Sequence, residues 1–300
     1  MFGPQEQSAC QELIRLALVE DLGDRGDVTS VTVIPEQLQG RAVFLVKAAG
    51  VVGGLPAAEL VMKTVDAKLK FEPQKNDGDR VTPGYRLATV SGSMRSILAA
   101  ERTALNFLQH LSGIATLTRQ FVDVVAGTSA KILDTRKTLP GWRLLEKYAV
   151  RQGGGHNHRM GLYDGILIKD NHLAALGIVA GADSLDVVET VMHIEEAMEK
   201  APESTRKIPL ELEVGSLQQF AFALGSWAGL ILLDNMSLDQ MREAVRMRNE
   251  RASTVLLEAS GGVNLQTVRA IAETGVDRIS VGALTHSAPA LDIALDYETA

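Results

Sequence analysis

The stretch that decides the fold is LILLDNMSLDQMREAVRMRNERASTVLLEASGGVNLQTVRAIAETGVDRISVGALTHS, residues 230–287. Its short apolar runs, LILLD, VLLEA and DRISV, alternate with segments such as SLDQMREAVRMRN and NLQTVRAIAETG, whose apolar spacing predicts helices. A strand, a helix and another strand in succession form the repeating unit of a parallel sheet. This stretch therefore predicts an α/β fold.

Three earlier apolar runs predict further strands of the same sheet. They are KILD, GILI and IPLELEV, at residues 131–134, 165–168 and 208–214. The chain thus offers six good strands, fewer than the eight of a complete barrel, so we expect an incomplete or irregular barrel. In such folds the active site lies at the carboxyl ends of the strands. Residues that follow a strand are therefore candidates for function.

The first part of the chain has a different pattern of expected strands and helices. From Gln39 to about Val90, β-type runs such as RAVFLVK and YRLATVSG accompany one helical stretch, PAAELVMKTVDA, which predicts a small α/β layer. A long helical pattern follows over residues 93–126. We expect Ser112-Gly113 to break it into two helices, and we place the domain boundary there.

Composition and charge exclude several classes of protein. The chain has 300 residues, 46% of them hydrophobic, which is enough for one large or two ordinary globular domains. The net charge of -7 argues against a nucleic-acid-binding surface over the whole chain. No apolar stretch approaches the roughly 18 residues of a membrane span. A single cysteine, Cys10, excludes an internal disulfide and fits the cytoplasm, which we expect as the location.

Polar residues or glycines follow nearly every predicted strand. They are Asp134, Thr135, Arg136 and Lys137; Lys169 and Asp170; Glu213; Asp234 and Asn235; Ser260, Gly261 and Gly262; and Gly282. One polar strand end is expected because loops are polar. A whole series of them predicts a functional site where the strand ends meet.

Basic residues gather between Lys131 and His172. This segment contains eight Lys or Arg and four Asp or Glu, so its formal net charge is +4. Arg offers a planar fork that matches carboxylate or phosphate oxygens, and Lys offers a point charge. An anionic substrate is therefore implied. For Arg143 and Lys147 a solvated helix is the better explanation, whereas Arg136 stands at a predicted strand end.

Two neighbouring glycine turns predict a phosphate site. Ser260-Gly261-Gly262 joins a strand to a helix, and Gly282 takes the corresponding place in the next unit. Glycines let backbone N–H groups approach phosphate oxygens, and a helix N-terminus adds a favourable dipole. The alternative is that these glycines only make tight turns. For an adjacent pair of such turns we favour phosphate.

Acidic residues stand on the strand LELEV and at the next strand end. Glu211 and Glu213 alternate with apolar residues, so both carboxylates face one side of the strand. With Asp234 they could hold Mg²⁺ through water and accept hydrogen bonds from sugar hydroxyls. They could also neutralise nearby basic residues, and the two interpretations are compatible.

His156 and His158 form an H-x-H pair, a spacing found among ligands of transition metals. The basic surroundings favour anions over cations, so we expect His158 to contact an anion and His156 to have no role. We expect Lys169 to anchor the anion. The main alternative is a Schiff-base nucleophile, as in a lyase or aldolase.

Several motifs, in order, resemble the quinolinate phosphoribosyltransferase family, also called nicotinate-nucleotide pyrophosphorylase (carboxylating). They are ERTALNFLQHLSGIAT, DTRKTLPGWRLLEKYAVRQGGGHNHRMGLYDGILIKDNH, LELEV, LLDNMS, EASGGVN and ISVGALTHS. The resemblance is close from Arg95 to Tyr297 and looser before that. Residues 174–207 align least clearly and carry none of the site residues that the resemblance implies.

For the fold, the resemblance implies an N-terminal α/β sandwich at residues 1–113 and an incomplete, open α/β barrel at residues 114–287. It implies that the tail, residues 288–300, packs on the N-terminal domain. It also implies a homodimer or hexamer with shared active sites, in which Arg102 reaches the site of a partner subunit.

For function, the resemblance implies a pentosyltransferase that joins quinolinate to 5-phosphoribosyl 1-pyrophosphate and releases pyrophosphate and CO2, leaving nicotinate mononucleotide. The implied substrate-binding residues are Arg102, Thr135, Arg136, Lys137, His158, Arg159, Lys169, Glu213, Asp234, Ser260, Gly261, Gly262, Gly282 and His286. Lys137, Lys169, Glu213 and Asp234 would be catalytic, and Mg²⁺ would be held by Glu213 and Asp234, partly through water or substrate. Nicotinate phosphoribosyltransferase and a molybdenum-transport protein of the same fold are the nearest alternatives.

Overall fold

The computed structural model describes residues 2–175, 192, 194, 196–251 and 254–298. The chain divides into two compact units. The first comprises Met1–Gln120, Lys137–His156 and Ala283–Ala300, and the second comprises Phe121–Arg136 and Asn157–Gly282. Most of the segment 174–207 that aligns least clearly lies outside the described residues.

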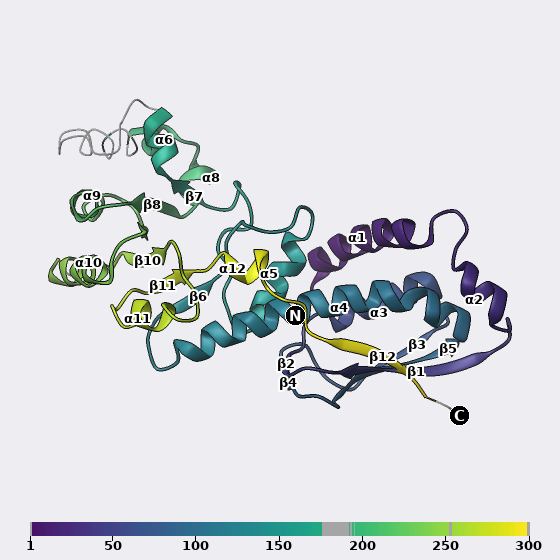
Figure 1. Ribbon diagram of the computed structural model, residues 1–300. Helices are drawn as coiled ribbons and strands as arrows, with labels where there is room; N and C mark the ends of the chain where they lie inside the picture. Colours follow the sequence, from purple (N-terminus) through teal and green to yellow (C-terminus); the bar gives the residue numbers. More distant parts are fainter. Residues whose placement is uncertain (1, 176–191, 193, 195, 252–253, 299–300) are drawn as a thin grey trace. The chain divides into compact units, whose positions relative to one another are not determined.

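The first unit is built on an antiparallel sheet of four strands in the order β12-β1-β5-β3, with a separate β2-β4 pair. The strands are β1 (Gln39–Val46), β2 (Gly50–Val51), β3 (Lys70–Pro73), β4 (Arg80–Val81), β5 (Arg86–Ser93) and β12 (Ile293–Tyr297). The helices are α1 (Pro4–Leu22), α2 (Val28–Val33), α3 (Leu55–Val65), α4 (Met94–Val124), α5 (Arg143–Gln152) and α12 (Ala283–His286). Figure 1 shows α1, α3 and α4 on the same face of the sheet, which makes an α/β sandwich.

The core of this unit consists of large apolar side chains from the sheet and from α4. Phe44 and Phe71 place their ring centroids 5.7 Å apart. Phe107, Leu108 and Leu111 of α4 are fully buried or nearly so. Burying side chains of this size contributes about 1.5–3 kcal/mol each. The apolar runs of the sequence thus become the contact between the two layers.

Helix α4 is continuous, so the expected break at Ser112-Gly113 is wrong. A Cβ on Gly113 would lie 2.1 Å from the carbonyl oxygen of Pro289. The hydroxyl of Ser112 hydrogen-bonds the backbone of Gly53, accepting from its N–H and donating to its carbonyl, both at 3.0 Å. Both small residues are therefore present for close packing.

The C-terminal strand joins the first unit. β12 pairs antiparallel with β1, with Ile293 opposite Val46 and Tyr297 opposite Ala42. The compact units also differ from a division at residue 113, because α4 runs through that position and residues 137–156 belong to the first unit. In the described part of the chain, no helix combines the length and apolarity needed to cross a membrane.

The second unit confirms the predicted six-stranded parallel sheet. Its order is β6-β11-β10-β9-β8-β7. The strands are β6 (Lys131–Leu133), β7 (Ile166–Ile168), β8 (Leu210–Val214), β9 (Leu230–Asp234), β10 (Leu256–Ser260) and β11 (Arg278–Ser280). The helices include α6 (Asp170–Ala175), α8 (Glu203–Arg206), α9 (Leu217–Ala223), α10 (Leu238–Glu250) and α11 (Val268–Ala272). The order is that of a barrel opened between β6 and β7, which form the two edges of the sheet.

Because all six strands are parallel, their carboxyl ends meet at one edge of the sheet. Apolar residues such as Ile231, Leu233, Leu257 and Ile279 are fully buried along these strands. They hold the sheet in place, and the polar residues that follow each strand line its edge.

Candidate active site

Lys169 and Glu213 meet at the ends of β7 and β8, where the Lys169 ammonium forms an ion pair with the Glu213 carboxylate. The Lys169 side chain is 40% exposed and that of Glu213 is 11% exposed. Burial raises the pKa of Glu213, Lys169 lowers it, and the charge of Asp234 raises it again. Glu213 and Asp234 therefore lie close enough to repel each other, and Lys169 offsets that repulsion.

The turn after β9 and the turn after β10 are packed together. The backbone N–H of Asn235 donates to the carbonyl of Ser260, at 3.0 Å. Asn235 has a φ of 52°, and its side-chain amide donates to Asp234 at 2.8 Å. A Cβ on Gly261 would lie 2.1 Å from the Asn235 side-chain oxygen, and Gly261 has a φ of +99°. Glycine is therefore required here by both conformation and contact.

Gly262 follows with a φ of +61° and open space where a Cβ would lie. Gly261 and Gly262 are both exposed and Ser260 is half-buried, so the backbone of this turn is accessible at the edge of the sheet. Such a turn can present N–H groups to an anion.

Arg136, which follows β6, and Arg159 lie near one another in this unit. The pKa of Arg159 is lowered, chiefly by burial and also by the charge of Arg136, while Glu211 raises it. One Nη of Arg159 donates to the carbonyl of Gly165 at 2.9 Å. Neighbouring guanidinium groups favour the binding of an anion, because it relieves their repulsion.

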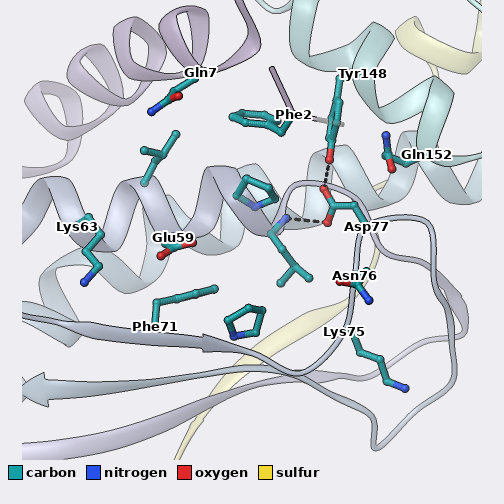
Figure 2. A pocket seen from close by; sticks show the side chains of 14 residues that line it. Phe2, Gln7, Glu59, Lys63, Phe71, Lys75, Asn76, Asp77, Tyr148 and Gln152 are labelled. Carbon is teal, nitrogen blue, oxygen red and sulfur yellow. Dashed lines mark hydrogen bonds between the residues drawn. The ribbon is translucent and has the colours of Figure 1, made fainter. Parts of the chain in front are cut away.

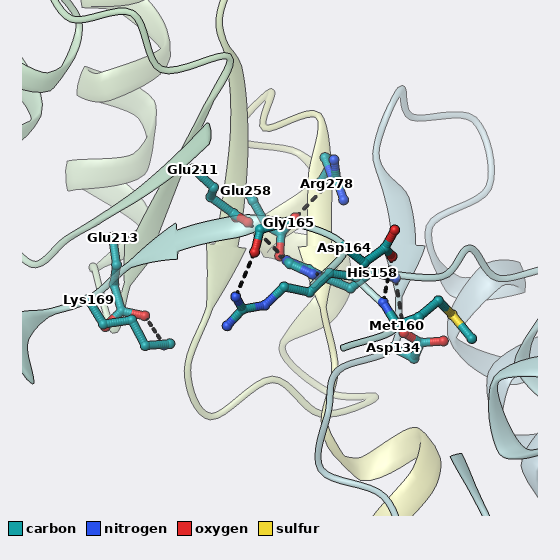
Figure 3. A network of polar contacts seen from close by, with 11 residues as sticks. Asp134, His158, Met160, Asp164, Gly165, Lys169, Glu211, Glu213, Glu258 and Arg278 are labelled. Atoms are coloured by element: carbon teal, nitrogen blue, oxygen red, sulfur yellow. Dashed lines mark hydrogen bonds and ion pairs between the residues drawn. The ribbon is translucent and has the colours of Figure 1, made fainter. Parts of the chain in front are cut away.

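Figure 3 shows that Gly165, the contact of Arg159, lies at the beginning of β7, whereas Lys169 and Glu213 lie at its end. Four residues of extended chain span roughly 13 Å. The structure thus brings Lys169, Glu213 and Asp234 together at the strand ends, and it places the Arg159 guanidinium at the opposite end of β7.

The ring of His158 is engaged by two buried acids. Its Nε2 lies 3.1 Å from Glu211 and 3.3 Å from Glu258. Arg278 approaches the other oxygen of Glu258 with its Nε at 2.8 Å. Figure 3 shows these residues as one network. The Nε2 atom therefore points to protein carboxylates in this structure.

The protonation state of His158 follows from its contacts. Burial lowers its pKa, but hydrogen bonds and charge interactions with Glu211 and Glu258 raise it to about 9. The backbone nitrogen of Arg159 lies 2.7 Å from Nδ1 of His158. This contact is a hydrogen bond only when Nδ1 carries no proton. Both carboxylates attract the positive charge of an imidazolium, whereas protonation of Nδ1 gives up one neutral hydrogen bond worth about 1 kcal/mol, so the carboxylates prevail and the ring is an imidazolium at neutral pH.

The remaining predicted site residues fall in both units. Thr135 and Arg136 follow β6 and are half-buried, and Gly282 ends the second unit. Arg102, Lys137 and His286 are exposed residues of the first unit: Arg102 on α4, Lys137 before α5, and His286 at the end of α12. The carbonyl of Lys137 accepts a hydrogen bond from the Thr285 hydroxyl at 2.7 Å.

Glu258 and Arg278 were missed by the sequence reasoning, and their role becomes visible only through His158. Their signal in the sequence is a charged residue inside an apolar run, Glu258 in VLLEA and Arg278 in DRISV. Glu258 is fully buried, although it stands in the middle of strand β10. An acid in such a run indicates a partner on a neighbouring strand or loop.

A small cavity of about 170 Å³ lies beside this network. Its lining includes Arg159, Gly165, Ile166, Leu230 and Arg278. Ile166, Leu230 and Arg278 each begin a strand, so this cavity lies away from the strand ends. It is smaller than the roughly 300 Å³ at which ligand pockets begin.

A larger cavity of about 690 Å³ lies within the first unit and contains none of the predicted site residues (Figure 2). At its wall, the Tyr148 hydroxyl donates to Asp77 at 2.5 Å. The same carboxylate accepts from the N–H groups of Gly54 and Leu55, at 2.7 and 3.0 Å, where α3 begins. Burial raises the pKa of Asp77, and these hydrogen bonds oppose that rise. Asp77 therefore caps a helix.

Comparisons with known proteins cover both units. Residues 27–112 match the model of the quinolinate phosphoribosyl transferase N-terminal domain, and residues 114–296 match that of the C-terminal domain. The chain is 46% identical over 298 residues to the nicotinate-nucleotide pyrophosphorylase [carboxylating] of Mycobacterium leprae, covering 99% of this chain and 100% of the relative.

Two further comparisons agree. The chain is 45% identical over 296 residues to quinolinate phosphoribosyltransferase [decarboxylating] 1b of Nicotiana tabacum, covering 96% of this chain and 82% of the relative. The solved nicotinate-nucleotide pyrophosphorylase of Francisella tularensis has a TM-score of 0.84 at 36% identity, covering 97% of this chain and 96% of that one. With both of its domains matched in sequence and the fold matched in space, the chain belongs to the quinolinate phosphoribosyltransferase family.

Proposed function

We propose that this protein is a pentosyltransferase that transfers the 5-phosphoribosyl group of phosphoribosyl pyrophosphate to quinolinate. The products are nicotinate mononucleotide, pyrophosphate and CO2, a step in the synthesis of pyridine nucleotides. The observation that carries the proposal is the match of both family domains over residues 27–112 and 114–296. The gathering of Lys169, Glu213 and Asp234 at the strand ends supports it.

Quinolinate carries two carboxylates, and the proposed contacts for them are cationic. Arg136 and Arg159 lie close enough in the second unit for their charges to repel. Arg102 would come from a partner subunit, while Thr135, Lys137, His158 and Lys169 would complete the basic pocket. Binding a dianion between Arg136 and Arg159 would relieve their repulsion, and for that purpose the Arg159 side chain would leave the Gly165 carbonyl.

Glu213 and Asp234 are the proposed residues for the ribose hydroxyls and for Mg²⁺. Their oxygens suit a hard cation, and their mutual repulsion gives such a cation a favourable place. When bound, Mg²⁺ would neutralise charge on the pyrophosphate. Ser260, Gly261, Gly262 and Gly282 would hold the 5-phosphate through backbone N–H groups, with His286 nearby.

The proposed chemistry follows from these charges. Departure of pyrophosphate builds positive charge at the ribose C1, and the carboxylates of Glu213 and Asp234 would favour that charge. Lys169 and Lys137 would stabilise the negative leaving group. The quinolinate nitrogen, held in place by its carboxylates, then bonds to C1.

Loss of CO2 follows transfer in this proposal. Once the ring nitrogen is alkylated and cationic, the electron pair left by the departing 2-carboxylate lies next to that positive nitrogen, and a proton then replaces the carboxyl group. The order is tested by following CO2 and nucleotide together in single turnover. Decarboxylated free quinolinate that forms before the nucleotide would exclude it.

The proposed function is tested with purified protein, phosphoribosyl pyrophosphate and Mg²⁺, with quinolinate and nicotinate as parallel substrates. We expect mononucleotide from quinolinate and little or none from nicotinate. Product from nicotinate alone would indicate a nicotinate phosphoribosyltransferase. A covalent adduct of Lys169 trapped with borohydride and a carbonyl substrate would instead indicate a Schiff-base enzyme.

We propose a homodimer or hexamer with active sites shared between subunits. Support comes from Arg102, a cation exposed on α4 in the first unit, whereas the acids of the site lie in the second. Mixing an Arg102→Ala chain with a Lys169→Ala chain should restore part of the activity, because one site in the mixed dimer would be intact. Confirmed mixed dimers without recovery would refute sharing.

We propose the cytoplasm as the location, on the strength of the single cysteine, Cys10, which is buried and free. Some plant relatives are named as chloroplastic or mitochondrial. Fractionation of the native cell tests the proposal, and recovery of the protein in an organelle or membrane fraction would contradict it.

A further inference from the structure

A layer of buried charges lies beneath the strand ends of the second unit. Glu211 is 5% exposed and Glu258 is fully buried. Glu211 stands two residues before Glu213 on β8, and Glu258 stands two residues before Ser260 on β10. Residues two apart on a strand share a face and lie roughly 7 Å from one another. The two buried acids are thus one layer below the proposed substrate contacts.

Arg278 belongs to the same layer through the register of the sheet. It stands directly opposite Glu258 on the neighbouring strand β11, and its Nε lies 2.8 Å from that carboxylate. Its side chain is 21% exposed and that of Glu258 is inaccessible. An acid buried so completely is costly unless a cation accompanies it. Arg278 is one such cation, and His158 is the second.

His158 connects this layer to the loop that carries Arg159. Its ring lies between Glu211 and Glu258, at 3.1 and 3.3 Å. Its backbone N–H donates to Asp134 at 3.0 Å, and Asp134 follows β6. The loop is therefore fastened both by its backbone and by the His158 ring, one residue before Arg159.

A metal centre is the competing explanation for these residues. One ligand atom from each of His158, Glu211 and Glu258 lies within 4.8 Å of the others, as in a metal site. The Arg278 guanidinium, however, already contacts Glu258 and would repel a cation. With an imidazolium at His158, two positive and two negative charges balance without an ion. The geometry therefore favours an ion-pair network.

We infer that Glu258 and Arg278 are positioning residues: they hold the His158 ring and, through it, the backbone at Arg159, from which the Arg159 side chain reaches a carboxylate of quinolinate once it leaves the Gly165 carbonyl. The inference rests on the proposed function, because it assigns the purpose of Arg159 by that function. Glu258 contacts His158, Arg278 and Ser280, and none of these is a proposed phosphoribosyl contact. Their effect should therefore be confined to quinolinate.

The test is the kinetics of Glu258→Gln, a change that keeps the shape of the side chain and removes its charge. We expect the KM for quinolinate to rise about tenfold or more, as for other residues that orient a ligand-binding group. The KM for phosphoribosyl pyrophosphate should stay unchanged. Arg278→Met should reproduce the effect, and Arg278→Lys, which restores the positive charge, should recover much of the loss.

Arg248→Gln is the matched control. Arg248 on α10 pairs with Asp277, directly before Arg278, and its side chain is 13% exposed. This variant also removes a partly buried ion pair next to β11, so it reports any general loss of stability. It should leave both KM values unchanged. Purified wild-type protein should contain no stoichiometric zinc or manganese that Glu258→Gln lacks.

Several results would overturn the inference. They are an unchanged quinolinate KM in folded Glu258→Gln, an equal rise of both KM values, or a metal that depends on Glu258. If Glu258→Gln does not fold, an Arg278→Met variant with the wild-type quinolinate KM would have the same meaning. Wild-type protein that neither binds nor converts quinolinate would overturn the proposed function together with the inference, whereas an active wild type with unaffected variants would overturn the inference alone.

Discussion

The ammonium group of Lys169 pairs with the carboxylate of Glu213 across the ends of two neighbouring strands, β7 and β8. Lys169 is 40% exposed and Glu213 only 11% exposed, so Glu213 depends on Lys169 for its counter-charge more than Lys169 depends on Glu213. The pair holds a cation and an anion next to each other. A substrate with both phosphate and hydroxyl groups can use the two together.

Lys169→Ala should abolish most turnover and leave the fold intact. We expect kcat to fall at least about a hundredfold, as when one preorganised charge is removed from a transition state. Because Glu213 loses its counter-charge, we also expect the unfolding midpoint to fall, while the variant still unfolds in one cooperative transition. Lys207→Ala is the control, since Lys207 and its partner Glu203 are both 73% exposed. The measurement is the steady-state kcat of the two variants. Equal values would show that Lys169 is not part of the active site.

Arg159→Ala should weaken the binding of quinolinate much more than the binding of phosphoribosyl pyrophosphate. A charged hydrogen bond contributes about 1.5–3 kcal/mol, which corresponds to roughly a ten- to hundredfold rise in KM for quinolinate. The exposed Arg242 on α10, altered to Ala, serves as the control. An equal loss of affinity for both substrates would count against the assignment of Arg159 to quinolinate.

Gly261→Ala should destabilise the protein more than Gly262→Ala. A Cβ at residue 262 meets open space, so only the positive φ costs energy, roughly 1–2 kcal/mol. At residue 261 the Cβ would also collide with Asn235, and overpacking adds about 1–3 kcal/mol. Urea unfolding measures both variants. Equal losses would mean that the turn adapts without cost.

Gly113→Ala should destabilise the protein, although Ala is ordinarily better in a helix by about 1 kcal/mol. The added Cβ would lie 2.1 Å from the Pro289 carbonyl, a contact that backbone has to move to relieve. We expect a net loss of about 1–3 kcal/mol in the free energy of unfolding, measured in urea. A gain in stability would show that the chain near Pro289 yields freely.

Stability should depend on pH through His158. Its pKa is raised from 6.5 to about 9 in the folded protein by Glu211 and Glu258. Protonation of His158 therefore stabilises the folded protein, and the full contribution is present below about pH 6.5. This contribution is lost as the pH rises through about 9. The difference in unfolding free energy between wild type and His158→Gln should shrink by up to about 3 kcal/mol between pH 6 and pH 10.

Urea unfolding of both proteins across that range provides the measurement. Comparing the two cancels the titration of groups that they share. Arg159 and Arg278, which also face this cluster, are present in both proteins. A difference that grows with pH would show that His158 is neutral when folded.

The parallel sheet was predicted because its evidence is local. A run such as LILLD is apolar enough to be buried, and the segment that follows it has helical spacing, so β9 and α10 could be read without knowing their neighbours. The break at Ser112-Gly113 failed for a non-local reason. The glycine is small to admit the chain at Pro289, which is distant in sequence.

The candidate site divides in the same way. Lys169 and Asp234 could be named because each follows an apolar run, and parallel strands bring such positions to one edge. Glu258 could not, because its partners Arg278 and His158 come from a neighbouring strand and from a loop a hundred residues earlier.

The sequence by itself determined the six strands of the parallel sheet, their order along the chain, and the polar residues at their ends, since these follow from hydrophobic periodicity over a few residues. Only the tertiary structure decided that β11 lies between β6 and β10, that Lys169 faces Glu213, and that His158 lies between two buried acids. Ion pairs and hydrogen bonds act over a few ångströms. Which side chains come within that distance depends on strand register and packing, and these are properties of the whole fold.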